Sequence, residues 1–169
     1  NNSDLIGKSV EQIMDIAQFH VDENGVQVRY DSVLDDGIDF RTNGIPSFVK
    51  KITGLSRQED WGRWSDKNLA DDVTIEMVEP LPKEFKLVVQ LVPFTPNVNK
   101  IIDIQIGNFI FPVRLLEGEN QYKLKVALDS NTYHKIIFKI HNSKTPKSLG
   151  INIDTRDIGV GFVDLKIEK

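Results

Sequence analysis

Cysteine is absent from this chain of 169 residues, which excludes disulfide bonds, thiolate zinc sites and a cysteine nucleophile within it. Long apolar runs are missing too, since no stretch approaches the ~20 residues of a membrane-spanning helix, and no signal peptide is found. The first residue is Asn1, so we expect a processed product or a segment excised from a longer chain. The net charge is −4 and no dense lysine and arginine run occurs, which disfavours a nucleic-acid partner.

Motifs for catalysis and cofactor binding are scarce as well. The histidines His20, His134 and His141 show neither H-x-H nor H-x-x-x-H spacing, so they predict no metal site. The acidic residues at 35–39 are more typical of a turn than of a calcium loop. No G-x-S-x-G elbow, P-loop or dinucleotide fingerprint is found. The sequence therefore predicts no cofactor and no metal, and it assigns no catalytic residue.

Short strand patterns make up most of what the sequence does contain. Apolar and polar residues alternate at 73–77 and 101–106, which is typical of half-buried strands. Residues 85–92 are the most apolar run of the chain and suit a strand buried on both faces. Asn24-Gly25 predicts the tight turn of a hairpin over 19–30. Further strands are expected at 38–40, 48–52, 109–111, 122–126, 136–140 and 159–167, with a turn at 43–46.

A helical pattern is confined to the beginning of the chain. Ser9 and Gln12 have the form of a capping box within residues 5–17. Because long helical crossovers are missing elsewhere, the sequence favours an all-β fold, an antiparallel, jelly-roll-like β-sandwich with a short N-terminal helix and hairpin. We expect residues 1–37 to be this lead-in and residues 38–169 to be the sandwich domain.

The stretch 54–66 differs from the rest, because it holds both tryptophans of the chain with Gly62 between them. Sugar-binding sites lay flat aromatic rings against the apolar face of a pyranose and use charged or amide side chains for its hydroxyls. Both kinds of side chain occur here within eight positions. The candidate ligand-binding residues are therefore Glu59, Trp61, Arg63, Trp64 and Asp66.

A structural role is the alternative interpretation of this stretch. A loop that enters a sandwich can anchor itself with a buried tryptophan, and a carboxylate can hold the neighbouring Arg63. Residues three apart on a strand point to opposite faces of the sheet. Trp61 and Trp64 can therefore face one ligand only if Gly62 interrupts the alternation.

The order of several short motifs resembles one domain family. The W-G-R-W-S sequence at 61–65 is the most specific of these motifs. The others follow in the same order: I-D-F at 38–40, G-I-P-S-F-V at 44–49, G-L-S at 54–56, P-L-P at 80–82, P-N at 96–97, L-G at 149–150, D-T-R-D at 154–157 and I-G-V-G-F at 158–162. Over residues 38–169 the chain is similar to the C-terminal domain of bacterial inner-membrane phosphoglycerol transferases, which have a sulfatase-like catalytic domain. A similar domain is attached to multi-spanning membrane glycosyltransferases.

The resemblance implies an extracytoplasmic β-sandwich on a membrane-anchored transferase that modifies cell-envelope glycans. The catalytic threonine and metal ligands of such transferases belong to another domain, and no matching motif is found here. The chain itself is therefore expected not to be an enzyme but an accessory domain at the periplasmic face of the inner membrane. Its expected partners are an envelope oligosaccharide and the catalytic or membrane domain of the parent protein.

Two other functions stay open at this point. The chain can be a purely structural or interaction domain that packs on the catalytic domain or on a partner. It can also be a stand-alone glycoside hydrolase with Glu59 and Asp66 as the two carboxylates, which requires their carboxyl groups to lie about 5–9.5 Å apart.

Overall fold

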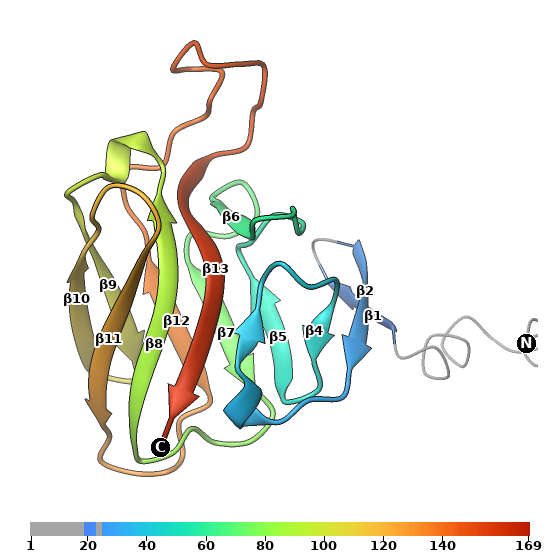
Figure 1. Ribbon diagram of the computed structural model, residues 1–169, viewed down its shortest axis with the longest axis vertical. Coiled ribbons are helices and arrows are strands. Elements are labelled where there is room, and N and C mark those ends of the chain that lie inside the picture. The colour runs from blue at the N-terminus through green and yellow to red at the C-terminus, as the bar shows by residue number, and fades with distance from the viewer. Residues whose placement is uncertain (1–18, 23–24) are drawn as a thin grey trace, which may run out of the picture.

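The computed structural model describes residues 19–22 and 25–169. Its described part is built from short strands and two 3-10 turns (Figure 1). In chain order these are β1 (Phe19–Asp22), β2 (Gly25–Tyr30), η2 (Leu34–Asp36), β3 (Ile38–Asp39), β4 (Ile45–Pro46), β5 (Val49–Thr53), β6 (Arg63–Asp66), β7 (Val73–Met77), β8 (Glu84–Pro93), η3 (Thr95–Asn97), β9 (Ile101–Ile106), β10 (Phe109–Arg114), β11 (Asn120–Ala127), β12 (Lys135–Lys139) and β13 (Ile158–Glu168). Within these residues no helix is long and apolar enough to cross a membrane.

Two five-stranded sheets form the sandwich. One has the strand order β10-β9-β12-β7-β5. The other has the order β11-β8-β13-β3, and β6 also pairs with β13. In Figure 1 the second sheet lies in front of the first. All strand pairs inside these two sheets are antiparallel, as the sequence predicted, so the protein is an all-β sandwich.

A small third sheet, with the order β1-β2-β4, lies beside the sandwich. Its β1 and β2 pair antiparallel, which confirms the strands of the expected hairpin. β4 pairs parallel to β2 through Arg29↔Ile45 and Tyr30↔Pro46. The sequence predicted a turn at 43–46, where β4 now lies, because Asn, Gly and Pro are frequent turn residues. The predicted helix at 5–17 lies outside the described residues.

The core lies between the two large sheets and consists mainly of Ile, Leu, Val and Phe side chains. Phe162 on β13 contacts Phe138 on β12 across the sandwich, with ring centroids 4.9 Å apart in an edge-to-face arrangement. Phe40 adds a second edge-to-face contact with Phe162 at 5.7 Å. These aromatic contacts join the two sheets near the middle of β13.

Strand β8 shows why the sequence patterns translate into this fold. Leu87, Val88 and Val89 are all buried, and β8 has a sheet neighbour on each side, β11 and β13. The strand predicted at 85–92 is confirmed, but burial on both faces holds only at its middle, because Lys86 is exposed and Gln90 and Val92 are half-buried on the second face. The bounds expected for β7 and β9 from strict alternation coincide with the structure.

Candidate functional site

The stretch 54–66 folds back on itself as an irregular hairpin. Leu55 and Ser65 form an antiparallel bridge, and the amide of Ser56 donates to the carbonyl of Trp64 at 2.8 Å. At the tip, Glu59 and Gly62 exchange two backbone hydrogen bonds of 2.8 and 3.2 Å. The hairpin therefore closes in a tight turn that contains Trp61, and Trp64 lies on its returning limb.

Gly62 lets this turn lie directly against β13. Its φ is 149°, a region that glycine adopts more readily than other residues. A Cβ atom at this position would lie 2.3 Å from the carbonyl oxygen of Phe162. The next residues then form β6, which pairs with β13 through Arg63↔Phe162 and Trp64↔Gly161.

Trp61 and Trp64 lie on the same side of the hairpin. Their ring centroids are 4.6 Å apart at an interplanar angle of 61°, and Phe94 contacts Trp64 at 5.8 Å. Regular strand alternation would have separated the two indoles, so the irregular backbone at Gly62 is what brings them together. Both tryptophans are half-buried, which leaves part of each indole accessible.

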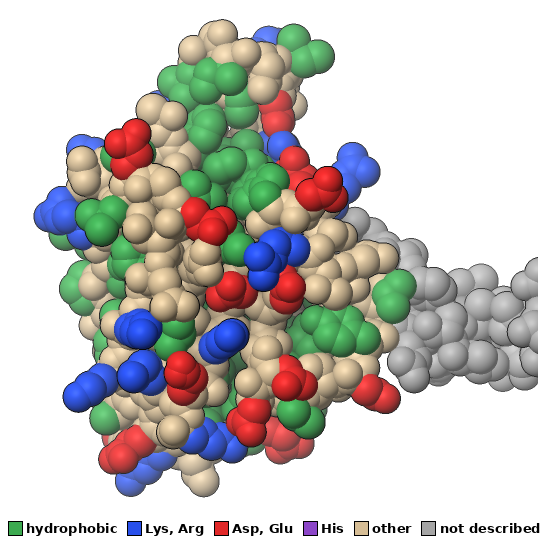
Figure 2. Space-filling model, viewed as in Figure 1, with side chains coloured by type: hydrophobic (Ala, Val, Ile, Leu, Met, Phe, Trp, Pro, Cys, Tyr) green, Lys and Arg blue, Asp and Glu red, His purple; other side chains and the backbone are tan. Residues whose placement is uncertain are grey.

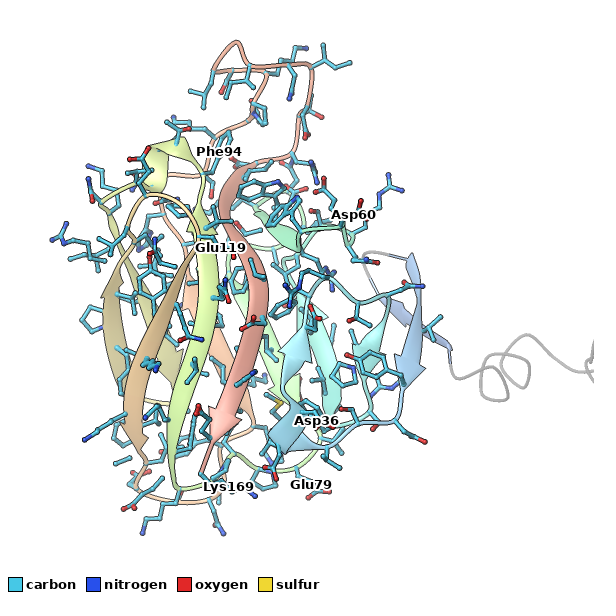
Figure 3. All side chains as sticks on the ribbon, in the orientation of Figure 1. Asp36, Asp60, Glu79, Phe94, Glu119 and Lys169 are labelled. Carbon is cyan, nitrogen blue, oxygen red and sulfur yellow. The ribbon has the colours of Figure 1, made fainter. Side chains whose placement is uncertain are left out.

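A second glycine makes room for the aromatic pair. The six-membered ring of Trp61 lies over Gly161 of β13, where a Cβ atom would approach it to within 2.6 Å. Figure 3 shows side chains gathered at this upper end of the sandwich, where Phe94 and Asp60 are labelled. The aromatic surface thus rests on the backbone of the central strand β13, which fixes its position.

Arg63 points into the hairpin rather than to the solvent. Its side chain is buried, and its guanidinium donates to the carbonyls of Ser56 at 2.7 Å and Leu55 at 3.2 Å. Charged donors to buried carbonyls are among the stronger hydrogen bonds in proteins. Arg63 therefore ties the two limbs of the hairpin together beneath the tryptophans.

Ser65 and Asp66 connect the hairpin to the start of β13. The hydroxyl of Ser65 accepts hydrogen bonds from the amides of Gly159 and Val160 at 3.1 and 2.9 Å. Oδ1 of Asp66 accepts from the amides of Asn68 and Asp157, both at 3.0 Å. Both side chains are buried, so they satisfy backbone donors that the irregular β6–β13 pairing leaves open.

Glu59 takes part in an ion-pair cluster with two residues from the other end of the sequence. Arg156 donates to Asp154 through Nε and Nη2, with the shortest distance at 2.7 Å. Its Nη1 contacts Glu59 Oε2 at 3.3 Å and Ser56 Oγ at 3.1 Å. The hydrogen bond from Arg156 lowers the pKa of Asp154, and the same bond raises the pKa of Arg156.

These side chains line a polar hollow of about 700 Å³ beside the hairpin. We call it the polar hollow, and its lining residues are Ser56, Arg57, Gln58, Glu59, Asp66, Leu69, Asp154 and Arg156. Three carboxylates and two guanidinium groups line it, so the hollow offers both hydrogen-bond donors and acceptors. Such a surface suits a polyhydroxylated ligand better than a strongly charged one. No cluster of three or more metal-ligating side chains is found in the described part of the chain.

The five residues selected from the sequence thus have different surroundings. Glu59 and Asp66 line the polar hollow, whereas the two tryptophans form the half-buried aromatic surface and Arg63 lies inside the hairpin. Arg156 was not among the candidates, although the D-T-R-D motif that contains it is part of the family resemblance. The sequence separation from Glu59 is 97 residues, so only the fold reveals the contact.

The strand order and pairing define an antiparallel β-sandwich domain. Two alanine variants of CBM29-2, a family 29 carbohydrate-binding module, align with a TM-score of 0.51 and 13% sequence identity. The alignments cover 79% and 78% of this chain, and 89% and 82% of those chains. At this identity the likeness shows a shared fold and nothing further.

The chain belongs to the family described as "Domain of unknown function (DUF7024)", whose model matches residues 21–169. It is 31% identical over 145 residues to "Phosphoglycerol transferase I" of Citrobacter koseri, covering 86% of this chain and 18% of that protein. It is 29% identical over 164 residues to the protein of the same name from Salmonella paratyphi B, covering 93% and 21%. The chain thus spans about a fifth of the length of these relatives, and the family resemblance noted from the sequence is confirmed.

Proposed function

We propose that this chain is a non-catalytic, extracytoplasmic accessory domain of a membrane-anchored transferase that modifies cell-envelope glycans by phosphoglycerol or glycosyl transfer. In this role the tryptophan hairpin and the polar hollow bind the glycan or position it for the catalytic domain. The partial-length similarity to phosphoglycerol transferases supports the assignment to such a parent protein. The single observation that carries the binding role is the half-buried Trp61–Trp64 pair beside the polar hollow.

Each candidate residue has a part in this proposal. Trp61 and Trp64 offer aromatic edges and faces for the apolar side of a sugar ring. Glu59 and Asp66 line the hollow and offer carboxylate oxygens to sugar hydroxyls. Arg63 holds the hairpin beneath both indoles through its bonds to main-chain carbonyls, so it acts on the ligand through their position.

The division of the chain at residue 38 belongs to the same proposal. Among the residues whose side chains the structure describes, Ile38 is the first member of the buried core, and β3 pairs with β13 of the sandwich. Residues 38–169 would then fold as the sandwich domain, with residues 1–37 as its lead-in.

A structural or interaction domain is the second candidate. The contacts of Arg63 with main-chain carbonyls and the seating of Gly62 on β13 favour it, because both stabilise the hairpin without any ligand. A hydrolase with Glu59 and Asp66 as its carboxylates is disfavoured. Asp66 already accepts two backbone amides and Glu59 is paired with Arg156, which are contacts typical of structural carboxylates.

A glycan array tests the proposal directly. The array carries glucose-, mannose- and amino-sugar-based oligosaccharides, with and without phosphoglycerol groups, and hits are measured by calorimetric titration. We expect Trp64→Ala and Trp61→Ala to weaken binding by about tenfold or more, since each removes an aromatic contact with the sugar. Tyr133→Ala is the matched control, because Tyr133 is an aromatic residue outside the hairpin. Its ring forms an edge-to-face pair with Phe109, with ring centroids 6.2 Å apart.

The structural candidate predicts a different result. The native chain would then bind no glycan on the array, and Trp64→Ala would change the denaturation midpoint alone. Binding that survives both tryptophan substitutions in folded protein would exclude the hairpin as the glycan site.

A further inference from the structure

Residues 141–157, which lie in the loop between β12 and β13, project beyond the sandwich as a finger (Figure 1), and we call them the finger loop. It is internally hydrogen-bonded. The amide of Ile151 donates to Pro146 at 3.0 Å and the amide of Gly150 donates to Lys147 at 3.1 Å. At its base, Lys144 and Ile158 exchange two backbone hydrogen bonds of 2.9 Å. These bonds give the finger loop a defined shape.

Three large aliphatic side chains of the finger loop face the solvent. Leu149 is 43% exposed, Ile151 is 56% exposed and Ile153 is 89% exposed. By contrast Pro146 of the same loop is buried. Figure 2 shows hydrophobic side chains at the top of the molecule, where this loop lies. Clustered exposed aliphatic residues on one projection are typical of a surface that contacts a protein or a membrane.

The charge of the finger loop distinguishes between these two partners. Lys144 and Lys147 are exposed, and no acidic residue occurs from 140 to 153 although the whole chain carries a net charge of −4. The next carboxylate along the chain, Asp154, is paired with Arg156. The tip therefore combines aliphatic and basic side chains, the composition of segments that bind an anionic lipid surface.

We propose that the finger loop contacts a bilayer containing anionic lipids. Leu149, Ile151 and Ile153 enter the interfacial region, and the ammonium groups of Lys144 and Lys147 lie near lipid phosphates. The tip is open to a large surface, since nothing beyond its chain neighbours lies within 4 Å of the Cβ position of Gly150, and the two lysines favour an anionic lipid surface as the partner. This inference is independent of the proposed glycan binding, since it uses different residues.

Membrane contact at the tip would also set the distance between the polar hollow and the lipid surface. The descending limb of the finger loop carries Asp154 and Arg156, which line that hollow. The amide of Lys147 donates to the carbonyl of Asp154 at 3.0 Å, so the tip and the hollow are connected by a short hydrogen-bonded segment. A docked tip would hold the hollow within a short distance of the lipid surface.

Vesicle co-sedimentation tests the proposal with the chain of residues 1–169. Vesicles of phosphatidylglycerol and phosphatidylethanolamine are compared with vesicles of phosphatidylcholine alone. We expect binding to the anionic vesicles, weakened by high salt. Replacing Leu149, Ile151 and Ile153 together with serine should weaken the partition coefficient by about tenfold or more. Lys144→Glu combined with Lys147→Glu should also weaken it.

Matched controls separate the tip from general surface effects. Ile110 on β10 is 58% exposed, so Ile110→Ser should leave vesicle binding unchanged, as should Lys123→Glu on β11. Because the chain has no cysteine, Ile153→Cys and Ile110→Cys can each carry a single nitroxide spin label. Electron paramagnetic resonance should then show oxygen accessibility increased by lipid at position 153 and unchanged at position 110.

Three results would each overturn the inference. The first is a native chain that stays in the supernatant with anionic vesicles at low salt. The second is binding that persists in the triple serine variant, and the third is a spin label at position 153 that stays in water. The substituted side chains are largely solvent-exposed, so the variants should unfold at the same midpoint as the native chain. A matching midpoint shows that a loss of binding is local.

Discussion

Single residues decide how the tryptophan hairpin is built, and Gly62 has the largest effect among them. Its backbone lies in a conformation that suits glycine, and it approaches the carbonyl of Phe162 closely. A side chain there would have to displace backbone rather than a flexible neighbour. The sequence indicated that this glycine would determine whether the indoles can face the same way, and the structure shows that they do.

Gly62→Ala should therefore destabilise the protein by about 2–4 kcal/mol, because backbone strain and a steric clash add. Urea denaturation followed by far-ultraviolet circular dichroism measures this change. Gly118→Ala is the control, since Gly118 also has a positive φ of 82° but nothing within 4 Å of its Cβ position. It should cost only about 1 kcal/mol. Equal effects of the two substitutions would contradict the close approach to β13.

Residue types were predictable from the sequence, but their partners were not. The sequence marked Arg63 as a charged neighbour of the tryptophans, yet its bonds go to main-chain carbonyls inside the hairpin. Arg156 reaches Ser56 across 100 positions of sequence. Such contacts depend on the path of the chain between the two positions, which local patterns do not contain.

At the scale of elements, β13 organises the molecule, because it pairs with β8, β6 and β3. Its junction with β3 places Asp164 directly opposite Asp39. Burial raises the pKa of Asp164, and the carboxylates of Asp39 and Glu119 add to this rise against the opposing effects of Arg41 and Lys166. Burial is the largest of these effects, so the ionised form of Asp164 is disfavoured in the folded state, and the like charge opposite it on β3 adds a smaller repulsion.

Asp164→Asn should stabilise the protein at pH 7 by about 0.5 kcal/mol. The native carboxyl of Asp164 binds a proton more tightly than in the unfolded chain, so the folded state loses relative stability as pH rises from about 4 through the raised pKa. The gain from asparagine should consequently be largest at neutral pH and shrink towards pH 4. Thermal unfolding of both proteins at several pH values measures it.

Asp39→Asn provides the comparison for this prediction. It removes the same repulsion, but it also removes the carboxylate that accepts from Arg41 at 2.8 Å. Although burial raises the pKa of Asp39, the bonds from Arg41 outweigh that effect and the pKa is lowered. Asp39→Asn should therefore stabilise the protein at pH 7 less than Asp164→Asn does. A gain for Asp164→Asn that is as large at pH 4 as at pH 7 would refute the electrostatic explanation.

Elements with strict alternation were predictable to the residue, as β7 and β9 show. Strands β4 and β6 were not predicted. β6 contains Arg63 and Asp66, both buried, so its polar sequence gives no strand pattern. The β4 residues lie next to Gly44, where a turn signal and a short parallel pairing cannot be distinguished locally.

For the whole molecule, the contact of Phe162 with Phe138 joins the two sheets, and both side chains are fully buried. Phe162→Ala should destabilise the protein by about 3–5 kcal/mol, because it leaves a cavity in the centre of the core. Urea denaturation measures the loss. If that variant does not fold, Phe162→Leu should still fold with a cost of about 1–1.5 kcal/mol.

Phe109→Ala is the control for this core contact. Phe109 is only partly buried at the edge of the same core, so its truncation should cost less than that of Phe162. A cost at Phe162 no larger than at Phe109 would mean that the two sheets do not depend on the central aromatic contact.

The sandwich class was predictable because a series of short alternating strands without helical crossovers permits few other architectures. The order of strands in each sheet was not, since β13 pairs with β3, whose residues come from more than a hundred positions earlier in the chain. The alternation of side chains specifies which face of a strand is buried, while the choice of neighbour depends on the packing of the entire chain.

The placement of the tryptophan pair has a spectroscopic consequence. The chain contains two tryptophans, and both belong to the hairpin beside the polar hollow with their rings 4.6 Å apart. Nearly all emission of the native protein excited at the red edge of indole absorption must therefore originate at this one place. A molecule that covers either ring changes that emission, so the protein reports its own occupancy without a dye.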